Sequence, residues 1–204
     1  PRVLTTPGYS AYVKISDGCD NRCTYCAIPL IRGRYASRPF EDIVEECRAL
    51  ADQGVTEITL IAQDTSRYGC DLGDGHYLLP ELLEAVSAIE KVHWVRVLYC
   101  YPDSTEDRLL DTIARLPKVA KYLDLPLQHI NDELLIQMNR RGTSEWIRSR
   151  IDECHRRGLL VRTTMIVGFP GETEAQFEEL MDFVKTARFE RLGAFTYSPE
   201  EGTK

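Results

Sequence analysis

Cys19-Asp20-Asn21-Arg22-Cys23-Thr24-Tyr25-Cys26 is the stretch of this chain that most constrains its fold and its chemistry. It follows the β-rich run Tyr12-Val13-Lys14-Ile15 and places three thiols on one short arc. A 4Fe-4S cluster has four iron corners that each need a ligand, so three cysteines leave one iron open to a substrate or cofactor. The uneven spacing therefore favours a cluster with one open iron.

The other cysteines argue against the commoner uses of a thiol. A structural zinc site normally takes its four ligands as two close pairs, and no second pair is present. A disulfide framework is not expected, because the seven cysteines are odd in number and no secretory signal is present. Free cysteines without such a signal predict a cytoplasmic protein. An incomplete zinc site or a redox site stays open as an alternative. The remaining thiols are expected in the core or in a loop, at Cys47, Cys70, Cys100 and Cys154.

Composition sets the class of protein. A chain of 204 residues with 43% hydrophobic and 28% charged residues suits one soluble globular domain spanning 1–204. No apolar run is long enough to cross a bilayer, so no membrane association is expected. The net charge of −7 argues against strong nucleic-acid binding by this piece and suits a basic protein partner, although mild acidity also serves solubility alone. Because the chain starts at Pro1 rather than Met, we expect a piece of a longer protein.

Strand and helix patterns alternate along the chain. Ser104 with Asp107, and Thr173 with Gln176, resemble capping pairs that begin two of the helices. Six strand–helix repeats predict an α/β fold with a parallel sheet and right-handed crossovers. We favour a partial (β/α)6 barrel with helices outside over an open doubly wound sheet. The predicted strands are 12–15, 57–62, 94–98, 122–125, 159–167 and 192–197. The predicted helices lie between Pro39 and Gly54, at 78–89, around Leu109, Leu110 and Ile113, near 132–138, at 144–157 and after Thr173.

Polar or glycine-bearing segments follow each predicted strand, where barrel-like α/β enzymes carry their active sites. We therefore expect Cys26, Gln63, Gln128 and Gly168 to line one cavity. The segment Gly168–Glu172 fits a simple turn into the next helix as well as a close backbone approach to a planar ligand. His129 fits a helix N-terminal residue with no ligand role better than a ligand-binding residue. The segments after strands two to six are Gln63-Asp64-Thr65, Tyr101-Pro102-Asp103, Pro126-Leu127-Gln128-His129, Gly168-Phe169-Pro170-Gly171-Glu172 and Ser198-Pro199-Glu200-Glu201-Gly202.

The cysteine run resembles the C-x3-C-x-aromatic-C signature of the radical S-adenosylmethionine (SAM) enzymes. Further segments, from about Ala11 to Thr203, resemble the methylthiotransferase branch of that family. Within the branch, Gln63-Asp64, Gln128-His129 and the acidic segment before Thr203 resemble members that modify an aspartate of protein twelve of the small ribosomal subunit, rather than members that modify tRNA. The segments that carry the branch are Ile28-Pro29, Arg32-Gly33, Ser37-Arg38-Pro39, Gln63-Asp64, Pro126-Leu127-Gln128-His129 and Ile166 to Thr173.

This resemblance implies a transferase that reductively cleaves SAM and methylthiolates the β-carbon of that aspartate. Cys19, Cys23 and Cys26 would hold one 4Fe-4S cluster with an open iron, which SAM binds; no further catalytic residue is assigned. The implied SAM contacts are Tyr25, Gln63, Gln128, Arg162, Val167 and Gly168.

The resemblance also implies parts and partners outside positions 1–204. These are an N-terminal domain with a second 4Fe-4S cluster, a small C-terminal β-barrel, a reducing electron donor and a basic ribosomal-protein substrate. The alternatives are a tRNA-adenosine methylthiotransferase core, a non-catalytic iron–sulfur module and a zinc-stabilised interaction domain.

Overall fold

Six parallel strands form the frame of the molecule, in a computed structural model that describes residues 4–203. Positions 1–3 and 204 of the predicted domain lie outside the described residues. The strands lie side by side in chain order, with ends within two residues of their predicted positions. They are β1 (Ser10–Lys14), β4 (Glu57–Ile61), β5 (Trp94–Val97), β6 (Tyr122–Asp124), β7 (Leu160–Val167) and β8 (Arg191–Thr196).

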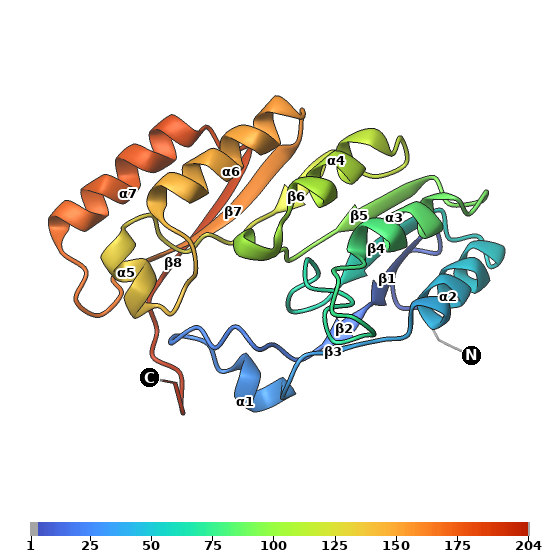
Figure 1. The fold of residues 1–204 in the computed structure, drawn as a ribbon, viewed down its shortest axis with the longest axis horizontal. Coiled ribbons are helices and arrows are strands. Elements are labelled where there is room, and N and C mark those ends of the chain that lie inside the picture. Colours follow the sequence, from blue (N-terminus) through green and yellow to red (C-terminus); the bar gives the residue numbers. More distant parts are fainter. Residues whose placement is uncertain (1–3, 204) are drawn as a thin grey trace.

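The helices cover the outer side of this curved arrangement (Figure 1). Their placement confirms the α/β class and the partial barrel, because a doubly wound sheet would carry helices on both faces. The long helices are α2 (Phe40–Asp52), α3 (Leu79–Ser87), α4 (Asp107–Arg115), α6 (Ser144–Arg156) and α7 (Glu174–Ala187). The short elements are β2 (Ser16–Asp17), α1 (Ile28–Arg32), β3 (Ala36–Ser37), the 3-10 helix η1 (Pro102–Ser104) and α5 (Asp132–Gln137). Among helices built from residues 4–203, none is both long and apolar enough to cross a membrane.

The strand sequences show why one face is covered and the other is left open. Along β1, Ala11 and Val13 are fully buried, while Tyr12 between them is 45% exposed. Successive side chains of a strand point to opposite faces, so the buried pair packs under the helices and Tyr12 faces the concave side. The concave face of the partial barrel is therefore accessible.

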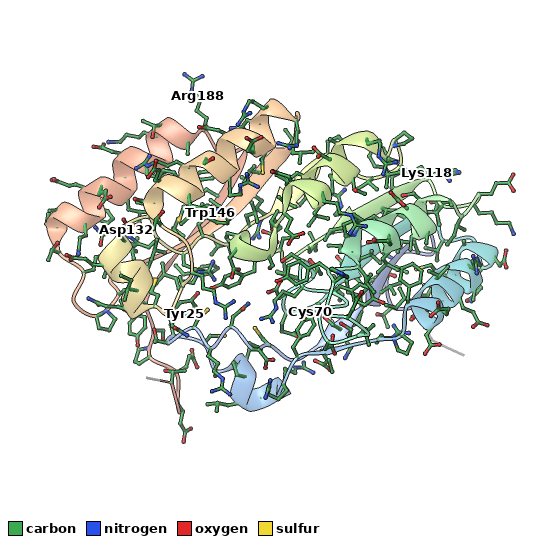
Figure 2. All side chains as sticks on the ribbon, in the orientation of Figure 1. Tyr25, Cys70, Lys118, Asp132, Trp146 and Arg188 are labelled. Carbon is green, nitrogen blue, oxygen red and sulfur yellow. The ribbon has the colours of Figure 1, made fainter. Side chains whose placement is uncertain are left out.

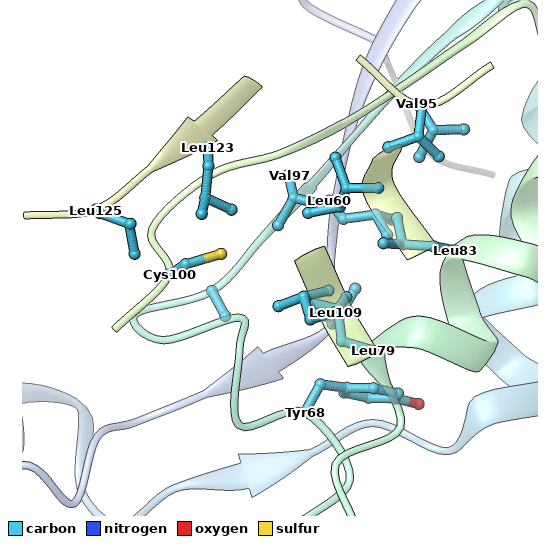
Figure 3. Packing of buried hydrophobic residues seen from close by; sticks show 14 of the residues in the cluster. Leu60, Tyr68, Leu79, Leu83, Val95, Val97, Cys100, Leu109, Leu123 and Leu125 are labelled. Atoms are coloured by element: carbon cyan, nitrogen blue, oxygen red, sulfur yellow. The ribbon is translucent and has the colours of Figure 1, made fainter. Parts of the chain in front are cut away.

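The parallel ladder is not continuous across the sheet. Pairing runs β1-β4-β5 and β6-β7-β8, and a single bridge, Val95 to Val119, connects the two sheets. A second link lies nearer the carboxyl ends, where the Cys100 N–H donates to the Asp124 carbonyl oxygen at 2.9 Å. Side chains close the seam between the sheets, as Figure 3 shows for Val97, Cys100, Leu123 and Leu125.

One of the two predicted capping pairs is correct. Thr173 and Gln176 form a full capping box at the start of α7. The prediction for Ser104 and Asp107 is wrong, because α4 begins after Glu106 without a side-chain cap. Ser104 is buried in η1 instead, and its hydroxyl lies 2.8 Å from that of Ser66. A tertiary hydrogen bond thus takes the hydroxyl that the local pattern assigned to the helix.

Candidate functional site

A cavity of about 170 Å³ lies at the carboxyl ends of the strands, with the cysteine loop as one wall. Figure 2 shows Tyr25 on this loop, beneath the strand ends. The expectation that Cys26, Gln63, Gln128 and Gly168 line one cavity is confirmed for the first three residues and wrong for Gly168. The wall consists of Cys19, Asn21, Cys23, Tyr25, Cys26, Ile28, Gln63, Tyr99, Cys100, Tyr101, Pro126, Gln128 and Arg140.

The three loop cysteines are free thiols, each half-buried on this wall. Within residues 4–203, no three histidine, cysteine or acidic side chains gather closely enough to hold one metal ion. Zinc needs its ligands about 2.3 Å from one point, whereas the thiolates of a cluster each bind a different iron. Three thiols on one cavity wall can each bind a different iron, as a cluster with one open iron requires. Burial raises the pKa of the Cys19 and Cys26 thiols, so metal loading must displace their protons.

The cysteine loop is fixed to the fold at several points. The Asn139 side chain donates to the carbonyl oxygens of Asn21 at 3.2 Å and Arg22 at 2.9 Å. The Thr24 N–H donates to the Met138 carbonyl oxygen at 3.1 Å, so the loop contacts the end of α5. At the start of the loop Gly18 has φ +71°, and a Cβ there would collide with the backbone of Arg34. Only glycine fits that turn.

A buried polar network supports the loop from below. Asp64 is 1% exposed and accepts from the Asn21 side chain at 2.9 Å and from the Ser66 hydroxyl at 2.6 Å. Burial raises the pKa of Asp64, and the two hydrogen bonds oppose that rise. The Tyr101 N–H donates to the Ser66 hydroxyl at 2.9 Å, which extends the network to the cavity wall. Asp64 therefore supports the loop.

Arg140 was not singled out from the sequence, although it contacts the loop directly. It is 9% exposed and its guanidinium lies 4.1 Å from the Tyr101 ring centroid. It donates towards Cys23 Sγ at 3.9 Å and the Tyr25 hydroxyl at 3.5 Å. Its neighbour Arg141 has a side chain 65% exposed and pairs with Asp103. The local sequence around these two adjacent arginines does not indicate which of them is buried.

Two amide oxygens of the cavity wall lack partners. Gln63 Oε1 and Gln128 Oε1 are buried and accept no hydrogen bond from residues 4–203. Unpaired buried acceptors are costly, and a ligand ammonium or amino group would satisfy them. Tyr99 and Gln128 also have positive φ values of 63° and 74°. Non-glycine residues in this conformation cluster at functional sites.

A neighbouring cavity shares Tyr25 and Gln128 with the first and extends along β7 and β8 to Glu200. Val167 and Gly168, although both are described, line neither cavity. The Gly168 N–H donates to Glu172 instead. Arg162 lines a third cavity and its guanidinium lies 2.8 Å from Asp124 Oδ1. Val167, Gly168 and Arg162 therefore line neither of these two cavities, and their contacts with SAM stay predictions.

His129 and Glu172 join the loops after β6 and β7. The Asn131 N–H donates to His129 Nδ1 at 3.0 Å, which assigns the ring proton to Nε2, 3.1 Å from Glu172 Oε1. The other oxygen of Glu172 accepts from the Gly168 and Phe169 N–H groups. His129 was predicted to begin a helix, but it lies two residues before Asn131, the N-cap of α5, and joins two loops instead. The role of Glu172 was not predicted.

The remaining candidates lie in different settings. Cys47 and Cys154 are fully buried and Cys70 is half-buried. Cys100 lies on the cavity wall, unforeseen from the sequence, with its sulfur 3.3 Å from the Thr65 hydroxyl. Of the nearby arginines, Arg34 pairs with a loop carboxylate, Asp20 Oδ1, at 2.8 Å.

The structure resembles solved structures of radical SAM proteins. A radical SAM methyltransferase, TsrM, from Kitasatospora setae superposes with a TM-score of 0.73 over 92% of this chain and 36% of that one, at 20% identity. Coproporphyrinogen III oxidase (HemN) from Escherichia coli gives a TM-score of 0.68 over 92% of this chain and 43% of that one, at 18% identity. At these identities the likeness shows a shared fold.

Comparison of sequences identifies much closer relatives. The ribosomal protein uS12 methylthiotransferase RimO of Desulforamulus reducens is 52% identical over all of this chain and 46% of the relative. The protein of the same name from Caldanaerobacter subterraneus subsp. tengcongensis is 51% identical over all of this chain and 47% of the relative. This chain therefore spans about half the length of these relatives. The model of the radical SAM superfamily matches residues 13–184, and the chain belongs to that superfamily.

Proposed function

We propose that this chain is the catalytic core of a methylthiotransferase that modifies an aspartate of ribosomal protein uS12. The observation that carries the proposal is the pair of unpartnered acceptors, Gln63 Oε1 and Gln128 Oε1, in the same cavity wall as three free thiols. The identity of about 50% to uS12 methylthiotransferases across the whole chain supports that substrate. Iron–sulfur and SAM chemistry are what the radical SAM family implies.

The proposed roles of the residues follow from their positions. Cys19, Cys23 and Cys26 hold three irons of the cluster. When bound, the cluster supplies one electron to SAM at its open iron. Gln63 and Gln128 accept from the polar end of SAM, and the half-buried side chain of Tyr25, which lines both cavities, excludes water between them. We also propose Val167, Gly168 and Arg162 as SAM contacts, which the family resemblance implies.

The proposed substrate is a basic ribosomal protein rather than RNA. The cavity that reaches Glu200 opens towards the acidic segment Ser198–Gly202, and the chain carries a net charge of −7. The negative charges of this segment repel the phosphate backbone of RNA and attract the lysine and arginine side chains of a basic protein. We further propose that a second cluster, a small β-barrel and a docking surface for an electron donor belong to the length of the relatives that this chain does not match.

The test begins with anaerobic reconstitution of the chain with iron and sulfide, followed by reduction with dithionite and addition of SAM. We expect an iron–sulfur absorption spectrum, and chromatography should detect 5′-deoxyadenosine. Gln63→Leu and Gln128→Leu should weaken SAM binding, whereas Gln53→Leu, on the exposed end of α2, should not. A full cluster that binds SAM without cleaving it would favour a non-catalytic iron–sulfur module. A bound zinc ion in place of the cluster would refute the proposal.

The substrate has its own test. This chain alone should add no methylthio group to uS12, because it lacks a second three-cysteine cluster site. Mass spectrometry of uS12 and of tRNA, with the full-length protein, distinguishes the two methylthiotransferase types. A mass gain on tRNA adenosine rather than on uS12 would contradict the proposed substrate.

A further inference from the structure

Arg140 is a buried cation without a carboxylate partner. Its side chain is 9% exposed, and within residues 4–203 no aspartate or glutamate forms an ion pair with it. Its neighbours are aromatic, sulfur or carbonyl groups: the Tyr101 ring, the Tyr25 hydroxyl, Cys23 Sγ and the Pro126 carbonyl oxygen. A fully buried charge normally has an opposite charge beside it.

These neighbours only partly offset the cost of burying the charge. The ring of Tyr101 lies 4.1 Å from the guanidinium carbon and attracts it through its negative face. The Pro126 carbonyl oxygen accepts one of its hydrogen bonds. Neither group carries a formal negative charge, so no anion among residues 4–203 pairs with the guanidinium.

Cys23 provides that anion once it binds iron. Its sulfur lies 3.9 Å from Arg140 Nη1, and a thiol that ligates iron does so as a thiolate. Charge and hydrogen bonds at the ligand sulfurs are among the factors that set the reduction potential of a cluster. Reduction adds one more negative charge, which a buried cation at this distance favours.

We infer that Arg140 is the built-in counter-ion of the cluster, and that it raises the cluster's reduction potential through Cys23. This inference rests on the proposed function. The side chain fits the task because its guanidinium lies over the Tyr101 ring while its Nη1 lies within reach of Cys23 Sγ and the Tyr25 hydroxyl. The planar guanidinium can stack and donate at the same time, which an ammonium group cannot.

The test is the midpoint potential of the reconstituted 204-residue chain, measured by a redox titration followed by electron paramagnetic resonance. Arg140→Met should lower the ratio of reduced to oxidised cluster at least tenfold at a fixed poise, a negative shift of about 59 mV for one electron. Arg140→Lys keeps the charge but not the stacking, and should shift the potential in the same direction by less. The matched control is Arg141→Met, because Arg141 is adjacent, exposed and paired with Asp103.

A metal-free measurement separates this role from a structural one. Without the cluster the arginine lacks its counter-ion, so Arg140→Met should leave the melting temperature of the metal-free chain unchanged or raise it. An unchanged midpoint potential in a folded, loaded Arg140→Met protein would overturn the inference, as would an equal shift in Arg141→Met.

Failure of assembly is also informative. If Arg140→Met folds but holds no cluster, recovery of the cluster in Arg140→Lys supports a charge requirement, whereas loss in both variants overturns it. If Arg140→Met fails to fold, the potential of Arg140→Lys against the Arg141→Met control decides the question. A wild-type chain that forms no iron–sulfur cluster would refute the proposed function itself. A wild-type cluster that is unaffected by position 140 would refute only the role of Arg140.

Discussion

Asn21, in the middle of the cysteine loop, donates its side-chain amide to the buried carboxylate of Asp64 at 2.9 Å. The two residues come from different parts of the chain, since Asp64 lies just after β4. This contact ties the position of the three thiols to the end of a core strand.

Replacement of Asp64 tests that link. Asp64→Ala leaves the Asn21 amide and the Ser66 hydroxyl without their acceptor and should lower the free energy of unfolding by about 2–3 kcal/mol. Asp64→Asn keeps the shape and one acceptor, so its loss should be smaller. Urea denaturation gives both values, and iron content after reconstitution reports on the loop. Equal stability of Asp64→Ala and wild type would show that the network does not support the loop.

The same carboxyl group predicts a pH dependence. Burial raises the pKa of folded Asp64 above the value of 3.8 expected when it is exposed, so the folded protein holds this proton more tightly than the unfolded chain. Its contribution to stability is therefore complete below about pH 4 and is lost as the pH rises through the folded pKa. In urea denaturation of the metal-free chain, the free energy of unfolding of Asp64→Asn should rise relative to that of wild type as the pH increases from about 4. A constant difference across that range would contradict the raised pKa.

The cysteine assignment makes a separate prediction about iron content. Cys19→Ala, Cys23→Ala and Cys26→Ala should each abolish the cluster, because each thiolate binds its own iron. Cys70→Ala is the matched control, since Cys70 is also half-buried but lies outside the cavity wall. Cys47→Ala, Cys100→Ala and Cys154→Ala should retain the cluster with some loss of stability from core packing. Iron that survives the loss of Cys23, or that disappears with Cys70, would refute the assignment.

Glu172 is expected to hold the turn after β7. Glu172→Ala leaves the N–H groups of Gly168 and Phe169 and the Nε2 proton of His129 without an acceptor. We expect a loss of about 2–3 kcal/mol in the free energy of unfolding, measured by urea denaturation. Glu178→Ala, on the exposed side of α7, serves as the control and should change the stability little. A loss no larger than that of the control would mean that the turn holds without Glu172.

The features that the sequence predicted are those with a local cause. Alternating burial along β1 and the capping box at Thr173 depend on residues within one turn or one strand. Ser104 shows the limit of local patterns, because its hydroxyl pairs with Ser66 from another loop. Arg140 and Arg141 are alike in sequence, and tertiary contacts with Tyr25, Tyr101 and Pro126 accompany the burial of Arg140 alone.

The cavity draws its walls from both three-stranded sheets, with Gln63 and Tyr101 after strands of one and Gln128 after a strand of the other. A cofactor bound there would contact both sheets, so its binding energy would also oppose their separation. A cofactor at one hundred times its dissociation constant adds about 2.7 kcal/mol to the free energy of unfolding. Loading would thus slow hydrogen exchange at the Cys100 amide, far from any iron ligand in sequence, because that amide spans the seam to Asp124.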